Sequence, residues 1–154
     1  MTSTTTEQVT GEPEGSPSIS HVGEVSADTC THCPMTHRIH NVGSAPMDVF
    51  DVEFLQQPSH PSDSVAGPVA AENASARVYN WVLSAGATSA MHTHKRPYLI
   101  VAATPLQLKM TAPDGQSFTE HVKAGDFHWV DSIVTHTLTN EGVAEGQIVE
   151  IELK

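Results

Sequence analysis

Three histidines have the spacing of a metal site built on β-strands. His92 and His94 are separated by one residue in a segment with strand character, so both imidazoles point to the same face. His136 begins a second candidate strand that could face the first. Imidazole is a good ligand for Fe, Zn, Ni and Cu, and three histidines leave coordination positions open for water or substrate. The spacing therefore predicts a metal centre held by His92, His94 and His136.

The residues around these histidines form two ordered motifs. The chain reads Gly86-x5-His92-x-His94 and, further on, Gly125-x5-Asp131-x-Ile133-x2-His136-x3-Asn140. These segments resemble the first and second motifs of the cupin superfamily of RmlC-like small barrels, over roughly Ala76 to Lys154. The resemblance implies an all-β fold, a jelly-roll or double-stranded β-helix barrel, with the metal inside and the three histidines as its ligands.

The chain departs from the cupin motifs at two places. Tyr98 stands where the first motif normally has a glutamate ligand, and Asp131 and Ile133 replace the usual Pro and Gly of the second motif. A site of three histidines without glutamate resembles that of the thiol and diketone dioxygenase cupins, which use Fe(II). Fe(II) is therefore the expected ion, with Zn, Mn and Ni as alternatives. A centre without an anionic ligand would favour an anionic, chelating substrate.

Three further side chains are candidates for the chemistry. If the strand continues after His94, Arg96 and Tyr98 lie on the histidine face, where Arg96 could pair with a carboxylate and Tyr98 could donate a hydrogen bond. Alternatively, Pro97 breaks the alternation and Arg96 points to solvent. His128 could be a fourth ligand or an acid–base group, or it could lie on the exterior of its strand.

The predicted function is that of a metal-dependent, dioxygenase-like oxidoreductase acting on a small anionic organic molecule. Two other functions stay open: a non-catalytic module that binds or senses a small ligand or metal, and a Zn, Mn or Ni isomerase or lyase. The fold alone does not decide among them. A homodimer is expected, because small cupins commonly dimerise through their sheet faces.

The elements that must position these residues are short strands. Tyr79, Trp81 and Leu83 alternate in one segment, and Pro113-Asp-Gly115 marks a turn between two others. Gly-containing turns separate the remaining strand candidates, and no segment has a helical period. The predicted strands of the barrel lie within 77–83, 91–103, 106–110, 118–122, 127–130, 134–140 and 147–153.

The N-terminal half divides into three predicted segments. Residues 1–20 are polar and are predicted to be a disordered tail, 21–56 a strand extension of the barrel at 76–154, and 57–75 a linker. Met47 to Leu55 is predicted to be a strand. Thr36-His37-x3-Asn41-x-Gly43 recurs as Thr135-His136-x3-Asn140-x-Gly142, which suggests that the extension is the remnant of a first cupin repeat. Cys30 and Cys33 lack the matching ligand pair of a zinc site.

The composition excludes two classes of partner. The formal charge is −11, with 7 Lys and Arg against 18 Asp and Glu, so the chain has no electrostatic means of binding nucleic acid or an anionic membrane. No apolar run approaches the roughly 20 residues that span a bilayer. With no signal-peptide pattern in the first thirty residues, the expected location is the cytoplasm.

Overall fold

The computed structural model describes residues 2–9, 13–27, 36–54 and 66–154, and all regular secondary structure in these ranges is β-strand. The strands are β1 (Thr2–Val9), β2 (Ser18–His21), β3 (His37–Asn41), β4 (Val69–Glu72), β5 (Ala76–Leu83), β6 (His92–His94), β7 (Tyr98–Ala102), β8 (Leu106–Thr111), β9 (Ser117–Val122), β10 (Phe127–Val130), β11 (Val134–Asn140) and β12 (Gly146–Leu153). The all-β prediction is confirmed. The described part of the chain contains no helix long and apolar enough to cross a membrane.

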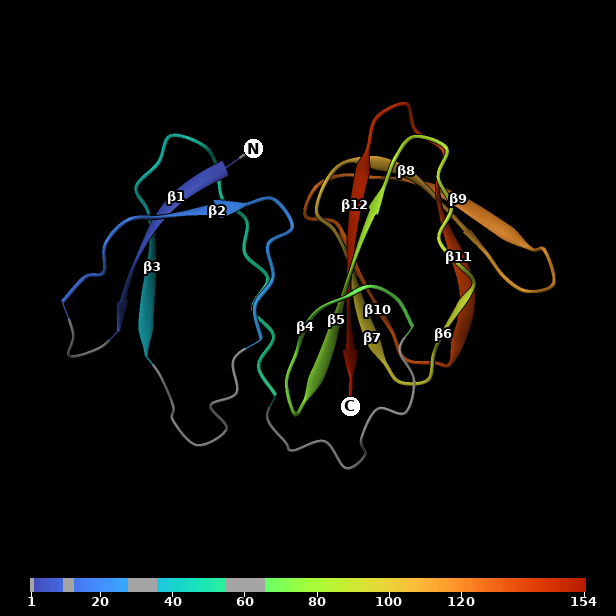
Figure 1. Cartoon of the computed structure of the whole chain (residues 1–154), viewed down its shortest axis with the longest axis horizontal. Helices are drawn as coiled ribbons and strands as arrows, with labels where there is room; N and C mark the ends of the chain where they lie inside the picture. Colours follow the sequence, from blue (N-terminus) through green and yellow to red (C-terminus); the bar gives the residue numbers. More distant parts are fainter. Residues whose placement is uncertain (1, 10–12, 28–35, 55–65) are drawn as a thin grey trace.

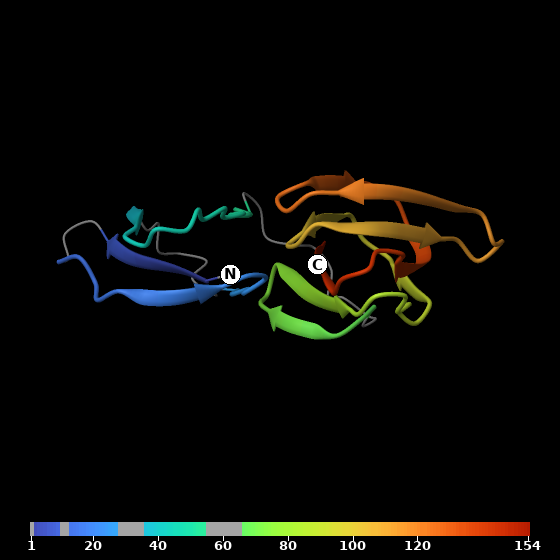
Figure 2. The ribbon, with the colours of Figure 1, turned by 90° about the horizontal axis from the view of Figure 1, so that it is seen from above.

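Residues 66–154 form a barrel of two facing sheets (Figures 1 and 2). One sheet has five antiparallel strands in the order β10-β7-β12-β5-β4, and the other has four in the order β6-β11-β8-β9. Alternate residues of each strand point between the sheets. Tyr79, Leu138 and Ile148 are almost completely buried there. The alternation of Tyr79, Trp81 and Leu83 in the sequence therefore marks the inner face of β5.

The segment predicted as one strand over 91–103 is two strands, β6 and β7, separated by Lys95, Arg96 and Pro97. Pro97 has no N–H to give to a ladder, which favours an interruption here. β6 pairs with β11 in the four-stranded sheet, while β7 pairs with β10 and β12 in the other. The chain thus crosses between the sheets at this point, so strand alternation cannot be carried from His94 through Arg96.

Three predictions for the N-terminal half are wrong at particular residues. The tail over 1–20 contains β1 and β2, and its Thr-rich residues suit a strand because β-branched side chains favour extended backbone. The linker over 57–75 contains β4, which pairs with β5 at the edge of the barrel sheet. No regular strand forms over the described part of Met47 to Leu55, residues 47–54, despite its alternation.

The N-terminal sheet repeats the strand arrangement of part of the barrel. Its order, β2-β1-β3, corresponds to β9-β8-β11 in the four-stranded sheet. Asn41 pairs with Thr5 as Asn140 pairs with Leu108, and the residue after each asparagine donates its N–H to the backbone oxygen of the partner strand. Among the described residues, the N-terminal sheet has no counterpart of β6, the strand that carries His92 and His94.

Two turns of the N-terminal sheet have the same hydrogen bonds as the corresponding turns of the barrel. Asn41 accepts a hydrogen bond from Gly43 N–H and donates to Ala45, as Asn140 accepts from Gly142 and donates to Ala144. The turns His21-Val-Gly-Glu24 and Lys123-Ala-Gly-Asp126 each place glycine at positive φ and use the acidic side chain to accept the first residue's N–H. The sequence repeat thus corresponds to a repeat of local structure that extends back to β1.

The two parts of the chain touch at few described contacts. Asn80 on β5 donates to the backbone oxygen of Gly23 at 3.1 Å. The rings of Phe50 and Phe127 meet edge to face, with centroids 5.4 Å apart. Phe127 and Trp129 on β10 are exposed, whereas Trp81 on β5 is buried.

Candidate metal centre

The three predicted histidines come together between the two sheets. His92 and His136 lie directly opposite each other in the β6–β11 ladder, and His94 is two residues further along β6 on the same face. Thr93 and Thr135, on the other face, are joined by a hydrogen bond of 2.9 Å between their hydroxyls. Strand alternation therefore places all three imidazoles inside the barrel, where each is at least 94 % buried.

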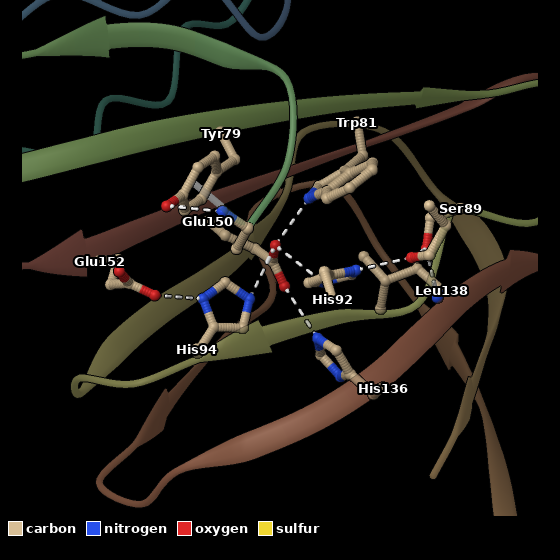
Figure 3. A network of polar contacts seen from close by, with 11 residues as sticks. Tyr79, Trp81, Ser89, His92, His94, His136, Leu138, Glu150 and Glu152 are labelled. Atoms are coloured by element: carbon tan, nitrogen blue, oxygen red, sulfur yellow. Dashed lines mark hydrogen bonds and ion pairs between the residues drawn. The ribbon is translucent and has the colours of Figure 1, made fainter. Parts of the chain in front are cut away.

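A carboxylate that the sequence analysis did not assign completes the group. Glu150 lies on β12, in the opposite sheet, and its side chain reaches across the barrel to the three imidazoles (Figure 3). One oxygen lies 3.2 Å from His94 Nε2 and 3.7 Å from His92 Nε2, and the other lies 3.6 Å from His136 Nε2. One ligand atom from each of the four residues falls within 4.8 Å of every other.

The atoms that face one another in this group lack hydrogen-bond partners. The Nε2 atoms of His92, His94 and His136 and the Oε1 atom of Glu150 are buried and unpaired. Each such atom costs about 1–3 kcal/mol in a folded protein, so four around one point require a compensating group. Three nitrogens and one carboxylate oxygen suit a divalent transition metal. The residues present therefore fit a mononuclear metal ion.

Neighbouring groups fix the orientation of the imidazoles. His92 Nδ1 lies 2.9 Å from the backbone oxygen of Ala90, and His94 Nδ1 lies 2.7 Å from a carboxylate oxygen of Glu152. Both contacts require a proton on Nδ1, so Nε2 is the atom of each of these rings that would bind a metal ion in the group. Glu152 is buried and points inward because it is two residues from Glu150 on β12.

Trp81 orients the carboxylate. Its indole N–H donates to Glu150 Oε2 at 2.6 Å, and its ring stacks on His92 with centroids 4.6 Å apart. Burial alone would raise the pKa of Glu150, but the three histidines beside it hold that pKa well below its usual range. Burial lowers the pKa of His94, yet Glu150 and Glu152 on its two nitrogens raise it to about 9.

Tyr98 contacts the site, but it is not one of the clustered residues that could bind a metal, unlike the glutamate of the usual cupin motif. Its ring stacks on His94 with centroids 3.9 Å apart and is 2 % exposed. Burial, together with the charges of Glu150 and Glu152, raises the pKa of its hydroxyl. Tyr98 therefore stays protonated, and it supports His94 by packing.

Of the two other predicted site residues, His128 lines the cavity beside the histidines and Arg96 does not. Arg96 lies in the crossing between β6 and β7, is partly exposed, and is not among the residues that line the cavity beside the histidines. His128 lines that cavity with His136 and Tyr98, but it is exposed and is not among the four clustered residues. Its role as an acid–base group stays a prediction, whereas the structure does not support a ligand role.

The expectation of an open site with three histidines and no carboxylate is wrong, because Glu150 supplies the carboxylate from another strand. The sequence did contain a signal. Glu150 and Glu152 alternate with apolar residues in a strand otherwise typical of a barrel interior, on the same face as Ile148. Acidic side chains are rarely buried without a partner, so their presence on an inner face predicts a positively charged or metal partner.

The N-terminal histidines that the structure describes form no comparable group. His37, the counterpart of His136, lies 2.6 Å from a carboxylate oxygen of Glu7 through Nδ1, and His40 lies 3.6 Å from Glu14. The prediction that Cys30 and Cys33 form no separate zinc site concerns residues outside the described ranges. Within those ranges, the group on β6, β11 and β12 is the cluster that could hold a metal.

Comparison with solved structures agrees with this architecture. A cupin domain from Bordetella pertussis is 27 % identical, covers 60 % of this chain and 99 % of its own, and superposes with a TM-score of 0.52. The barrel has the cupin fold. Two further structures are similar. An RmlC-like cupin from Shewanella frigidimarina is 17 % identical, covers 53 % of this chain and 68 % of its own, and has a TM-score of 0.41. A cupin superfamily protein from Desulfitobacterium hafniense is 13 % identical, covers 71 % of this chain and 98 % of its own, and has a TM-score of 0.44. No family model and no curated protein matches the chain.

Proposed function

We propose that this cupin domain is a mononuclear metal-dependent enzyme that acts on a small organic molecule. The observation that carries the proposal is the set of four unpaired buried atoms on His92, His94, His136 and Glu150. One of the four residues, His136, lines a cavity together with Tyr98. A metal held by the four residues would be reached by a molecule in this cavity.

The residues of the chain have separable tasks in this proposal. His92, His94, His136 and Glu150 would hold the ion, while Ala90, Glu152 and Trp81 orient three of these ligands. The ion supplies Lewis-acid or redox chemistry and, with four protein ligands, can retain positions for substrate. His128 faces the same cavity and could exchange a proton with a bound molecule.

Dioxygenase-like chemistry with Fe(II) remains the first activity to test, and Zn, Mn and Ni remain alternatives. The argument for Fe(II) from a centre of three neutral ligands no longer holds, because Glu150 adds a negative charge. A set of three imidazoles and one carboxylate suits each of these ions. Metal identity must therefore come from measurement.

The test is metal analysis of untagged protein, with His92→Ala and His121→Ala compared. His121 lies on β9, is exposed and is outside the cluster, so it is a matched control. We expect one equivalent of a transition metal in the wild type and in His121→Ala, and a large loss in His92→Ala. Absence of metal from all three proteins, after offering Fe(II), Zn, Mn and Ni, would reject the proposal.

Activity is tested separately from metal binding. O₂ consumption by the Fe(II)-loaded protein should appear with some members of a panel of thiols, diketones and small aromatic alcohols. Metal binding with no turnover of any kind, but with tight binding of a panel member, would instead support a non-catalytic binding module.

A further inference from the structure

A cavity of about 590 Å³ extends from His136 and Tyr98 to residues of β8, β9 and β10. Its inner end contains His136 and Tyr98, which are both nearly completely buried. Its rim contains exposed residues, among them Phe118, Phe127 and His128. The volume lies in the range of pockets that enclose small organic ligands.

The walls of the cavity between these ends are mostly apolar. Residues from both sheets contribute, including Ile100, Leu108, Met110, Val122 and Ile148. They are the inward residues of their strands, so the apolar character follows from the same alternation that builds the core. A ligand body in this space would exchange water for aliphatic and aromatic contacts.

No lysine or arginine is among the described residues that line the cavity. The ionised residues there are Glu120 and Asp126, both exposed at the rim and both acidic. Arg96, the residue predicted to pair with a substrate carboxylate, lies outside the lining. An anionic group on the body of a ligand would thus lose its hydration without gaining a cationic partner, which is strongly unfavourable.

The group of His92, His94, His136 and Glu150 also gives less reason to expect an anionic ligand. The expectation of an anionic substrate depended on three neutral ligands, but Glu150 places a carboxylate among the histidines and Glu152 bonds His94 behind it, so a divalent ion there would have a smaller net positive charge. The chain as a whole has a formal charge of −11. Long-range attraction of an anion toward this site is therefore absent as well.

We infer that the cavity binds an uncharged, largely apolar molecule, such as a monocyclic aromatic alcohol, with its single polar end toward His136 and Tyr98. This inference rests on the proposed function for the orientation of the polar end. The preference for an uncharged body rests on the cavity walls alone. The two parts can therefore fail separately.

The test uses three probes that share a phenol and a three-carbon chain: 4-propylphenol, 3-(4-hydroxyphenyl)propanamide and 3-(4-hydroxyphenyl)propanoate. Binding to the full-length protein is measured by calorimetry, with and without metal. We expect both uncharged probes to bind at least about tenfold more tightly than the carboxylate, because an unpaired buried charge costs more than the roughly 1.4 kcal/mol that a tenfold change represents. The amide separates the effect of charge from that of hydrophobicity.

A charge introduced into the wall should reverse the preference. Met110 lines the cavity on β8, whereas Gln107 lies on the opposite face of the same strand. Met110→Lys should bind the carboxylate at least about tenfold more tightly than the wild type does, since it supplies the missing partner. Gln107→Lys, which makes the same change of net charge outside the cavity, should leave all three affinities unchanged.

Equal or tighter binding of the carboxylate by the wild-type protein would overturn the inference, and so would no binding of any probe. The same measurements on metal-free protein distinguish this failure from that of the proposed function. If metal never binds but the preference for uncharged probes holds, the metal proposal fails and the cavity inference stands.

Discussion

Replacing Glu150 with glutamine tests the metal centre at the residue that the sequence did not assign. Glutamine keeps the volume of the buried side chain and an oxygen that can accept the Trp81 indole N–H, now 2.6 Å from the carboxylate. The change therefore removes one negative charge from a group that is 0 % exposed. Because this charge lies at the point where three histidine Nε2 atoms converge, metal affinity should fall steeply.

The magnitude follows from the place of Glu150 in the cluster. Residues that only orient metal ligands typically contribute 10–100-fold to affinity, so loss of a direct anionic ligand should cost at least about 100-fold, or about 2.7 kcal/mol. At a free metal concentration of about 100 times the wild-type Kd, metal stabilises the wild type by about 2.7 kcal/mol. The same concentration would stabilise Glu150→Gln by only about 0.4 kcal/mol.

The assay is competition with a fluorescent chelator, followed by urea unfolding with and without metal. Glu145→Gln is the matched control, because Glu145 is exposed in the loop before β12 and the change of charge is the same. Glu152→Gln should lie between the two, since Glu152 touches only the Nδ1 side of His94. A Glu150→Gln affinity within about threefold of the control would refute the assignment of Glu150 as a ligand.

Three further predictions concern the surroundings of the site and the stability of the barrel. In Trp129→Phe, the remaining tryptophan is Trp81, which lies against His92 and Glu150, so binding of Co(II) should quench its fluorescence. In Trp81→Phe, the remaining tryptophan is the exposed Trp129, and Co(II) should leave its fluorescence nearly unchanged. Leu138→Ala, at 0 % exposure, should lower the free energy of unfolding by about 2–5 kcal/mol in urea titrations, whereas Val82→Ala, on the exposed face of β5, should change it by no more than about 0.5 kcal/mol. Arg77, and then Lys154, lower the pKa of Glu72 to about 2, so the stability that Glu72 contributes is complete above about pH 4.5 and is lost as the pH falls toward 2. Since Glu72 is more than one-third exposed, Glu72→Gln should cost less than about 1 kcal/mol at pH 6 and nothing measurable near pH 2.

Features determined by local pattern could be predicted from the sequence. Strand alternation and Gly-containing turns predicted the β-strands of the barrel, and the His-x-His spacing predicted two imidazoles on one face of a strand. The place of the third histidine could be predicted because His136 lies in a motif of fixed spacing that ends in the Asn140 turn. In each case the deciding interaction lies within one strand and the turn next to it.

Features that depend on which strands face each other could not be obtained in this way. Arg96 was assigned to the histidine face by extending the alternation, but the chain crosses to the other sheet at that point. Thr2–Val9 lacks an apolar period and still forms a strand, because β2 and β3 pair with both of its edges. The pairing partner, rather than the local composition, decides the structure of such a segment.

The position of the carboxylate connects the metal site to the substrate. In the usual cupin motif, the glutamate would stand at position 98, at the start of β7, but here that position holds a tyrosine ring stacked on His94. Glu150 reaches the same histidines from β12, and its neighbour Glu152 orients one of them. Tyr98 then lines the cavity with an uncharged, protonated side chain where the usual motif would place a charged ligand. Because the carboxylate of the group comes from β12 rather than from β7, the cavity wall has no acidic or basic side chain between Tyr98 and the rim. An uncharged ligand therefore suits this domain.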